Sequence, residues 1–259
     1  MKRLPFLAIA AFAALAGGCF KNHGRPADVP TVVGLDALAR TNRAEVVRLF
    51  LRGTAKPIPA DALANLPKLQ VLDLAECSLK ALPGEVCSLK TLRHLYLARN
   101  SLTALPPELA QLDGLTYLNL DGNRLADVPD VVARLTSLKW LRFSENELKG
   151  LPASLSALKD VRRLYARRNK IAAVPEVVKE WPLLEDLVLD RNPISQVPDW
   201  LVSMPNLRNV SFADCGIAKL PDDLSAWRRL SSLVLSGCPI SETERKRIRA
   251  QLPDVALLF

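Results

Sequence analysis

The sequence predicts an α/β solenoid, a coil of stacked units that each contain one strand and one return segment. Seven Leu-Pro or Val-Pro pairs stand 23 residues apart, with their prolines at Pro83, Pro106, Pro129, Pro152, Pro175, Pro198 and Pro221. Within each period, apolar residues two positions apart show the alternation of a strand. A period this strict is typical of stacked supersecondary units. One long helical array is excluded, because a proline in each period would interrupt it.

Each period divides into two segments. The repeats begin at Leu69, Leu92, Leu115, Leu138, Val161, Leu184, Leu207 and Leu230. Positions 4 and 6 are apolar and share one face of a short strand, and position 9 is Asn or Cys. The proline at position 15 opens the second segment, since proline is tolerated in a first helical turn but not in a helix interior. The sequence therefore predicts a short strand, a turn, and a short helical or extended return in every repeat.

The repeat follows the pattern L-x-x-L-x-L-x-x-N/C-x-L, as in residues 92–102 (LRHLYLARNSL). It resembles the leucine-rich repeat family, in the variant whose convex segment begins with Leu-Pro. The resemblance covers residues 69–252, which make eight repeats. It implies a right-handed, horseshoe-like coil with a parallel sheet on the concave side and short helical or extended segments on the convex side. It also implies a non-enzymatic scaffold that binds a protein partner.

Open stacks expose apolar ends, so both ends should carry caps. Residues 34–68 are predicted to form an N-terminal cap and an irregular repeat: residues 35–40 form a short helix, and Val46, Leu49 and Leu51 occupy positions 1, 4 and 6. At the other end, Ser241 and Glu244 have the spacing of a capping box. They predict a capping helix that belongs to the last repeat. Residues 253–259 are expected to form a terminal strand.

The amino terminus has the layout of an export signal. In residues 1–18, Lys2 and Arg3 precede an apolar run that is shorter than the ~20 residues of a membrane span, and small residues follow. Residues 15–19 (LAGGC) resemble the lipobox of bacterial lipoproteins. This implies lipidation of Cys19 by diacylglycerol, with fatty acyl chains such as palmitate. Residues 19–33 would then be the lipidated cysteine and a tether. The alternatives are an ordinary cleaved signal peptide and a cytoplasmic protein with an unusual start.

The resemblance to lipoproteins also suggests where the chain resides. Because Phe20 rather than Asp follows the cysteine, the sorting pattern of enteric bacteria favours the outer membrane. We therefore expect an outer-membrane lipoprotein of the bacterial cell envelope, attached to the membrane through Cys19.

Three of the five cysteines share one register position. Cys77, Cys215 and Cys238 stand at position 9, where an inward-pointing residue bonds the backbone in leucine-rich repeats. Cys215 and Cys238 lie on neighbouring rungs, about 5 Å apart and within disulfide range. Parallel side chains suit the disulfide dihedral poorly, so a bridge between them stays open. No His or carboxylate accompanies this ladder, and we expect neither a metal site nor a cofactor.

The side chains at positions 2, 3, 5, 7 and 8 point away from the core, toward the concave side. In repeats two to five they include eight basic and two acidic residues and all three tyrosines. Exposed Arg, Tyr and Trp are enriched at binding hot spots. The predicted ligand-binding residues are Arg93, His94, Tyr96, Tyr117, Trp140, Arg142, Arg162, Arg163, Tyr165 and Arg167. The plain alternative is that any concave sheet must present some surface side chains.

The formal net charge of +8 does not by itself identify a partner. A protein partner is predicted, and an anionic envelope glycan or lipid is the alternative ligand for the same face. Nucleic acid is not expected for an exported lipoprotein. An enzyme is not expected either, because the sequence contains no nucleophile elbow, phosphate loop or zinc spacing. Reversing the charges of Arg142 and Arg163 together should abolish partner capture and leave the melting temperature nearly unchanged.

Overall fold

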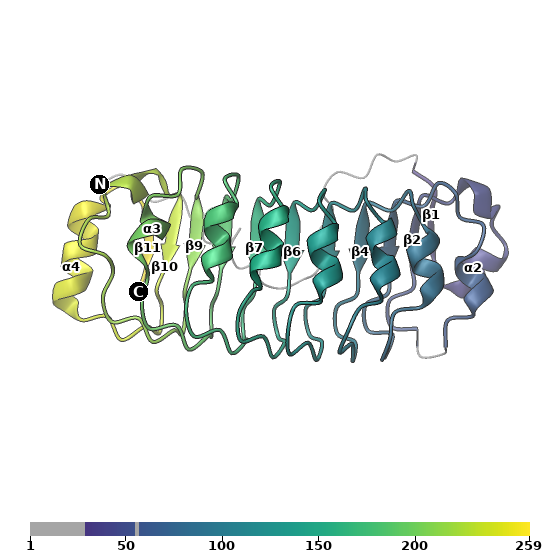
Figure 1. Ribbon diagram of the computed structural model, residues 1–259, viewed down its shortest axis with the longest axis horizontal. Helices are drawn as coiled ribbons and strands as arrows, with labels where there is room; N and C mark the ends of the chain where they lie inside the picture. The colour runs from purple at the N-terminus through teal and green to yellow at the C-terminus, as the bar shows by residue number, and fades with distance from the viewer. Residues whose placement is uncertain (1–28, 55–56) are drawn as a thin grey trace.

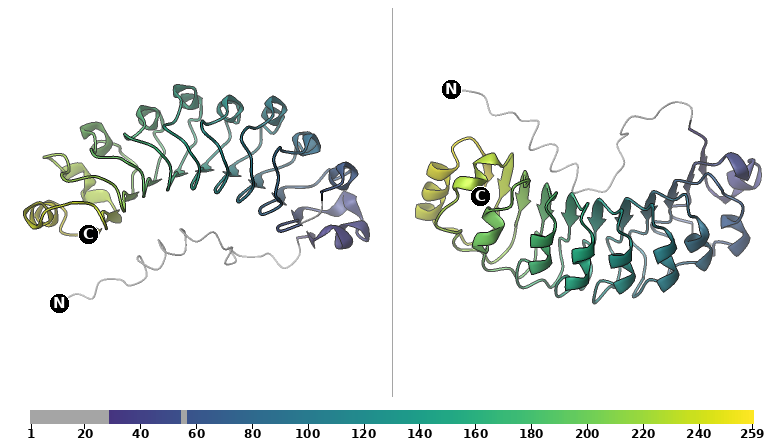
Figure 2. Two further views of the ribbon diagram at one scale, coloured as in Figure 1. Left: turned by 90° about the horizontal axis from the view of Figure 1, so that it is seen from below. Right: turned by 45° about the horizontal axis from the view of Figure 1, so that its top comes forward.

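The computed structural model describes residues 29–54 and 57–259 of the chain. Its strands form one parallel sheet in which spatial order follows chain order from β1 to β11. The strands line the inner side of a curved solenoid, and short helices form the outer side (Figures 1 and 2). The strands are β1 (Thr31–Val33), β2 (Arg48–Phe50), β3 (Val71–Asp73), β4 (His94–Tyr96), β5 (Tyr117–Asn119), β6 (Trp140–Arg142), β7 (Arg163–Tyr165), β8 (Asp186–Val188), β9 (Asn209–Ser211), β10 (Ser232–Val234) and β11 (Ala256–Leu258).

The return segments of repeats one to seven are short helices of four or five residues. Those of repeats one to five are 3₁₀ helices, and each begins directly after the proline of its Leu-Pro or Val-Pro pair. The helical elements are α2 (Leu35–Ala39), η1 (Arg43–Glu45), η2 (Ala60–Leu63), η3 (Gly84–Ser88), η4 (Pro107–Gln111), η5 (Asp130–Arg134), η6 (Ala153–Ala157), η7 (Glu176–Glu180), α3 (Asp199–Val202), η8 (Ser225–Arg229) and α4 (Glu242–Gln251). The predicted α/β solenoid is therefore confirmed.

The register between strands equals one repeat. Leu95 pairs with Leu118, and Leu118 pairs with Leu141, so identical positions of successive repeats lie side by side. Positions 1, 4 and 6 fill the core and are almost completely inaccessible to solvent. Larger side chains fill the convex side of this core, where the indole nitrogen of the buried Trp181 donates to the Leu155 carbonyl oxygen at 3.0 Å.

Position 9 forms a hydrogen-bonded ladder beside the sheet. The Asn146 amide donates to the carbonyl oxygens of Leu120 and Phe143, and its own oxygen accepts from the Leu125 amide. These bonds satisfy buried backbone groups in the turns, where neither strand nor helix supplies a partner. Asn100, Asn123, Asn169 and Asn192 repeat the arrangement.

The cysteines at the ladder position replace part of this pattern. The thiols of Cys77 and Cys238 lie 3.1 Å from the carbonyl oxygens of Leu51 and Phe212, and that of Cys215 lies 3.5 Å from the Leu189 oxygen. All three are buried free thiols, so the structure contains no bridge between Cys215 and Cys238. A thiol is one weak donor, and it cannot replace the amide oxygen of Asn as an acceptor.

The N-terminal end differs from its predicted boundary. The tether was predicted to reach residue 33, but Thr31–Val33 form β1, which pairs in parallel with β2. Val32 is buried in this strand and Val33 is 69% exposed at the sheet edge. The strand is short and precedes the first leucine of the pattern, so periodicity carried no sign of it. Next to it, α2 buries Leu38, and the irregular repeat buries Val46, Leu49 and Leu51.

The C-terminal end is covered by α4 and β11. The Ser241 hydroxyl accepts from the Glu244 amide at 3.2 Å, which is one half of a capping box. The Glu244 carboxylate does not return to residue 241; it accepts from the Leu220 amide and binds Arg247. Ile248 and Leu252 face the core, and β11 extends the sheet beside β10.

Residues 1–28 lie outside the described residues, and with them the predicted signal peptide and Cys19. Over residues 29–54 and 57–259, no helix is both long enough and apolar enough to cross a bilayer.

Candidate functional site

Four neighbouring strands carry the predicted binding residues. His94 and Tyr96 lie on β4, Tyr117 on β5, Trp140 and Arg142 on β6, and Arg163 and Tyr165 on β7. Arg93 and Arg162 immediately precede β4 and β7, and Arg167 follows β7. The sheet register places position 3 of each repeat beside position 3 of the next, and it does the same for position 5. The structure therefore brings all ten residues onto one region of the concave face.

Position 3 forms an aromatic row across β4, β5 and β6, which consists of His94, Tyr117 and Trp140. The ring centres of His94 and Tyr117 are 5.8 Å apart, and those of Tyr117 and Trp140 are 5.7 Å apart, both edge to face. Such pairs contribute about 0.5–1.5 kcal/mol beyond the burial of their surface. All three residues are half-buried, so they remain in part accessible to a ligand.

The same column continues beyond the aromatic row as a chain of polar contacts. The Arg163 guanidinium lies 4.3 Å from the centre of the Trp140 ring, and its Nε lies 3.2 Å from the Asp186 carboxylate. The Asn209 amide then donates to Asp186 at 2.8 Å, and the Ser232 hydroxyl donates to Asn209 at 2.8 Å. From β7 to β10, the side chains at position 3 thus contact one another across the strands, and none of them is apolar.

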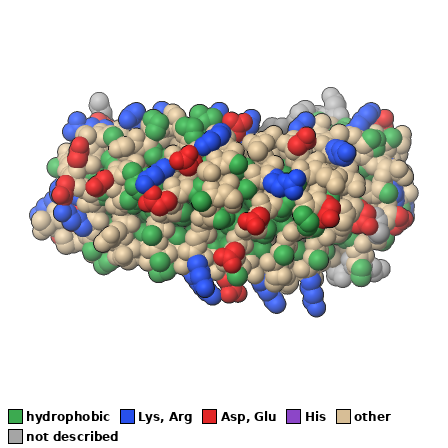
Figure 3. Space-filling model, in the orientation of Figure 1, with side chains coloured by type: hydrophobic (Ala, Val, Ile, Leu, Met, Phe, Trp, Pro, Cys, Tyr) green, Lys and Arg blue, Asp and Glu red, His purple; other side chains and the backbone are tan. Residues whose placement is uncertain are grey.

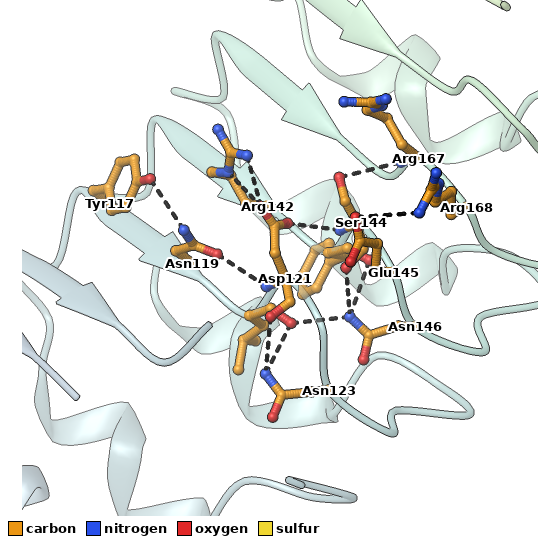
Figure 4. A network of polar contacts seen from close by, with 12 residues as sticks. Tyr117, Asn119, Asp121, Asn123, Arg142, Ser144, Glu145, Asn146, Arg167 and Arg168 are labelled. Atoms are coloured by element: carbon orange, nitrogen blue, oxygen red, sulfur yellow. Dashed lines mark hydrogen bonds and ion pairs between the residues drawn. The ribbon is translucent and has the colours of Figure 1, made fainter. Parts of the chain in front are cut away.

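Arg142 and Asp121 form the most buried ion pair of the face (Figure 4). Their nearest atoms are 2.6 Å apart, and the side chains are 13% and 16% exposed. Asp121 also accepts from the Ser144 amide at 2.7 Å. Burial raises the pKa of Asp121 although Arg142 acts against this, and the carboxylate raises the pKa of Arg142 although burial acts against it. Arg142 also stacks on Tyr165, 4.9 Å from its ring centre.

Three further arginines of the predicted patch are paired with carboxylates as well. Arg162 binds Glu185 at 2.7 Å, Arg163 binds Asp186, and Arg167 lies 3.3 Å from Asp190. Their partners, Glu185, Asp186 and Asp190, belong to repeat six, next to the repeats whose charges were counted in the prediction. The expectation of a strongly basic patch on repeats two to five is therefore wrong, because carboxylates one repeat away neutralise most of it.

Two of the predicted tyrosines contribute little accessible surface. Tyr96 is 5% exposed and Tyr165 is 6% exposed, since neighbouring side chains of the sheet surface cover them. Burial raises the pKa of Tyr165, and its hydroxyl donates to Asp186 at 3.3 Å. Tyr117 is more accessible, and burial raises its pKa to about 12. Burial, together with the charge of Arg48, lowers the pKa of His94 and so disfavours protonation of its imidazole.

Four cations on the concave positions have no carboxylate within ion-pair distance among the described residues. They are Arg48, Arg93, Lys139 and Arg208. Arg93 donates to the Gly114 carbonyl oxygen at 2.9 Å, and Arg208 donates to the Arg229 carbonyl oxygen at 3.2 Å. Lys139 is exposed, and Arg48 is half-buried on β2. Three of the four lie on β2, or directly before β4 and β6, close to the aromatic row.

The pairing of arginines on this face with Asp121, Asp186 and Asp190 was not predicted from the sequence. Asp190 is buried and accepts from the Ser211 hydroxyl and the Ala213 amide. A sequence signal existed, because Arg163 and Arg167 stand one period of 23 residues before Asp186 and Asp190. In the portion of the chain that the structure describes, no cluster of three or more His, Cys, Asp or Glu residues could hold a metal ion.

The helix-bearing side shows a different distribution. Lys, Arg, Asp and Glu side chains are interspersed over it, with apolar side chains scattered between them (Figure 3). Among the described residues drawn there, positive and negative side chains alternate rather than forming a field of one sign. The aromatic row and its unpaired cations therefore distinguish the concave face as the candidate site.

Comparison with known proteins agrees with the fold. A family described as leucine rich repeat matches residues 67–125 and 113–171. No curated protein shows significant similarity to the chain. Among solved structures, a leucine-rich repeat protein of Leptospira interrogans has a TM-score of 0.62 and 24% identity, covering 88% of this chain and 69% of its own.

Two proteins of Listeria monocytogenes share the architecture. An internalin, InlF, has a TM-score of 0.68 and 20% identity, with 83% of this chain and 67% of that chain covered. The functional domain of InlJ, described as including a cysteine ladder, has a TM-score of 0.61 and 22% identity, with 81% of this chain and 41% of that chain covered. At these identities the likeness concerns the fold.

Proposed function

Because the chain folds as a leucine-rich repeat solenoid, we propose that it is a non-enzymatic scaffold that binds a protein partner on its concave face. The observation that most supports this proposal is the half-buried aromatic row of His94, Tyr117 and Trp140. This row lies beside cations that lack a carboxylate partner. Aromatic side chains that are large, rigid and partly accessible are the residues that dominate binding energy at protein interfaces.

The rigidity of the face supports a binding role. Arg142, Arg163 and Arg167 are held by carboxylates of the adjacent repeat, so they order the surface around the aromatic row. A surface that is ordered before binding loses less conformational entropy when a partner docks. In this proposal the arginines hold the surface in place, and the aromatic row makes the contact.

The amino terminus supports a location for the scaffold. The basic, apolar and small-residue segments of residues 1–18 and the lipobox-like residues 15–19 favour export and lipidation of Cys19. We assign the protein to the bacterial cell envelope, preferentially the outer membrane, with the solenoid carried on a short tether. Stable anchoring requires more than one acyl chain, and a lipidated cysteine supplies this.

A steric block tests which face binds. A polyethylene glycol chain attached at Lys139→Cys would cover the concave face, and one attached at Ser154→Cys would cover the convex face; both native side chains are exposed. Capture of a partner from envelope extract should be lost only with the first. Equal loss with both, or loss with the second alone, would contradict concave recognition.

Membrane attachment has its own test. The Cys19→Ala variant should move from the membrane fraction to the soluble fraction, because it lacks the lipid-bearing thiol. Incorporation of labelled palmitate should be lost in parallel, while Cys87→Ala should keep both the label and the membrane location. A Cys19→Ala protein that stays in the membrane fraction would rule out the anchor.

A further inference from the structure

We propose that the partner presents an acidic segment, with an apolar side chain seated on the aromatic row and carboxylates beside Arg93 and Lys139. This inference rests on the proposed function and specifies the chemistry of the partner and its place on the face. The footprint is repeats two to four, around β4, β5 and β6, rather than the whole solenoid.

The charge balance of the face favours an acidic partner. Every carboxylate at the concave positions that the structure describes has an arginine from its own or a neighbouring repeat within ion-pair distance. The surplus therefore consists only of cations. Arg48, Arg93 and Lys139 place this surplus around the aromatic row, where carboxylates of a partner would complement it.

The geometry of the rings favours an inserted side chain over a flat sugar face. Successive rings of the aromatic row are inclined by 69° and 62°, so they form no continuous platform. The Arg163 guanidinium lies over one face of Trp140, and Tyr96 lies 4.7 Å from Tyr117 at 38°. Ring edges therefore remain accessible in part, and they can pack against a branched or aromatic side chain of a peptide.

Arg93 is positioned by a glycine. A methyl group on Gly114 would lie 1.9 Å from Nη1 of Arg93 and 2.8 Å from its Cζ, so this guanidinium occupies the space that the glycine leaves. The hydrogen bond from Arg93 to the Gly114 carbonyl oxygen fixes the group there. The cation is thus oriented by the backbone while its charge remains uncompensated, which suits it to meet an incoming carboxylate.

The C-terminal half of the face provides the contrast. From β7 to β10 the position-3 side chains bond to one another, and the one cation left there without a carboxylate partner is Arg208. It has no aromatic neighbour at position 3 of its own strand, where Asn209 stands. Arg208 therefore offers a matched control for Lys139: both are exposed cations at position 2.

The test uses the intact protein and a library of short random peptides as the probe. Enriched peptides should combine Asp or Glu with an aromatic or branched aliphatic residue. Lys139→Glu and Trp140→Ala should each weaken the best peptide about tenfold or more, as expected for central contacts. Arg208→Glu should change affinity less than about twofold. Gly114→Ala, which displaces only the flexible end of Arg93, should weaken binding about threefold.

Three outcomes would overturn the inference. Enriched peptides could lack acidic residues, or Arg208→Glu could weaken binding as much as Lys139→Glu. Polygalacturonate, a polysaccharide probe, could bind more tightly than any peptide and show the same variant sensitivities. In the first two cases a block by the modified Lys139→Cys protein would still support concave recognition of a protein, so failure of the footprint is distinguishable from failure of the proposed function. Melting temperatures of all variants exclude unfolding as the cause.

Discussion

At the scale of single residues, Arg142 shows how packing changes the meaning of a charge. In the sequence it is one of several exposed-looking arginines, and in the structure it is almost covered, between Asp121 and the Tyr165 ring. A residue in this environment contributes mainly to the stability of the fold. Its charge is matched inside the protein, so it adds little to the field that a partner meets.

Reversing this charge should therefore destabilise the protein, contrary to the expectation from sequence. Arg142→Glu would place a second carboxylate against Asp121 in a site with little water, and we expect a loss of about 3 kcal/mol or more. Urea denaturation measures it. The control is Arg99→Glu, whose native side chain is 71% exposed, and which should change stability by less than about 1 kcal/mol. Equal effects of the two variants would contradict the buried-pair interpretation.

Asp190 gives a pH dependence of unusual sign. Burial raises its pKa, although Ser211, Ala213 and Arg167 favour the carboxylate. The Asp190 carboxyl group therefore binds its proton more tightly in the folded protein than in the unfolded chain. Protonation of Asp190 stabilises the fold fully below the pKa of the unfolded state, and this stabilisation is lost as pH rises through the pKa of the folded state. The stability of the wild type minus that of Asp190→Asn should increase as pH falls from neutral.

Glu147 is the matched control for this titration. Its hydrogen bond to Lys170 lowers its pKa, so its stabilisation is present above the unfolded pKa and lost as pH falls through the folded one. The difference between wild type and Glu147→Gln should therefore shrink as pH falls. Urea titrations at a series of pH values compare the two, and slopes of the same sign would contradict the Asp190 argument.

At the scale of elements, the ladder at position 9 joins each turn to the next. Asn can accept from one backbone amide and donate to several carbonyls, whereas Cys offers one weak donor. The structure uses both: Asn in the middle repeats, and Cys at Cys77, Cys215 and Cys238 toward the two ends. The resemblance to leucine-rich repeats implied this role, and the register assigned it to these residues, because a position that recurs in each period has the same environment in each repeat.

Removing one ladder amide should be costly. Asn146→Ala would leave the Leu125 amide and the Leu120 and Phe143 carbonyls without this partner, and we expect a loss of about 3 kcal/mol or more. Cys215→Ala removes a single weak bond and a small buried group, and should cost about 1–2 kcal/mol. Chemical denaturation ranks the two variants, and a larger loss for the cysteine would refute the assignment.

The 23-residue period predicted the features that recur in every repeat, and it gave no sign of the features that occur once or that join two repeats. Positions 1, 4 and 6 and the convex turns followed directly from the leucines and prolines. Strand β1 escaped because Thr31–Val33 carry no recurring pattern; only pairing with β2 reveals it. The charge pairs escaped because each joins two repeats, as Arg163 and Asp186 do. Counting charges repeat by repeat separates such partners, although they are adjacent in the sheet.

At the scale of the whole molecule, each repeat contacts only its neighbours, so stability is close to a sum of local terms along the coil. The end repeats then have the lowest local stability, because each has a neighbouring repeat on one side only. Their caps should therefore determine where local unfolding begins. At the C-terminal end the cap is α4, which buries Ile248, while Arg247 binds Glu244 and the carbonyl oxygens of Leu220, Pro221 and Asp222.

Loosening this cap should open the molecule from one end. Ile248→Ala removes a completely buried side chain and should cost about 2–5 kcal/mol. Because neighbours alone are coupled, hydrogen exchange should accelerate first in β10 and β11, while the amides of β5 and β6 keep their protection. Lys246→Ala, an exposed change on the same helix, should leave exchange unaltered. Uniform acceleration over all strands in Ile248→Ala would instead show that the solenoid unfolds as one cooperative unit, and that the aromatic row depends on a cap several repeats away.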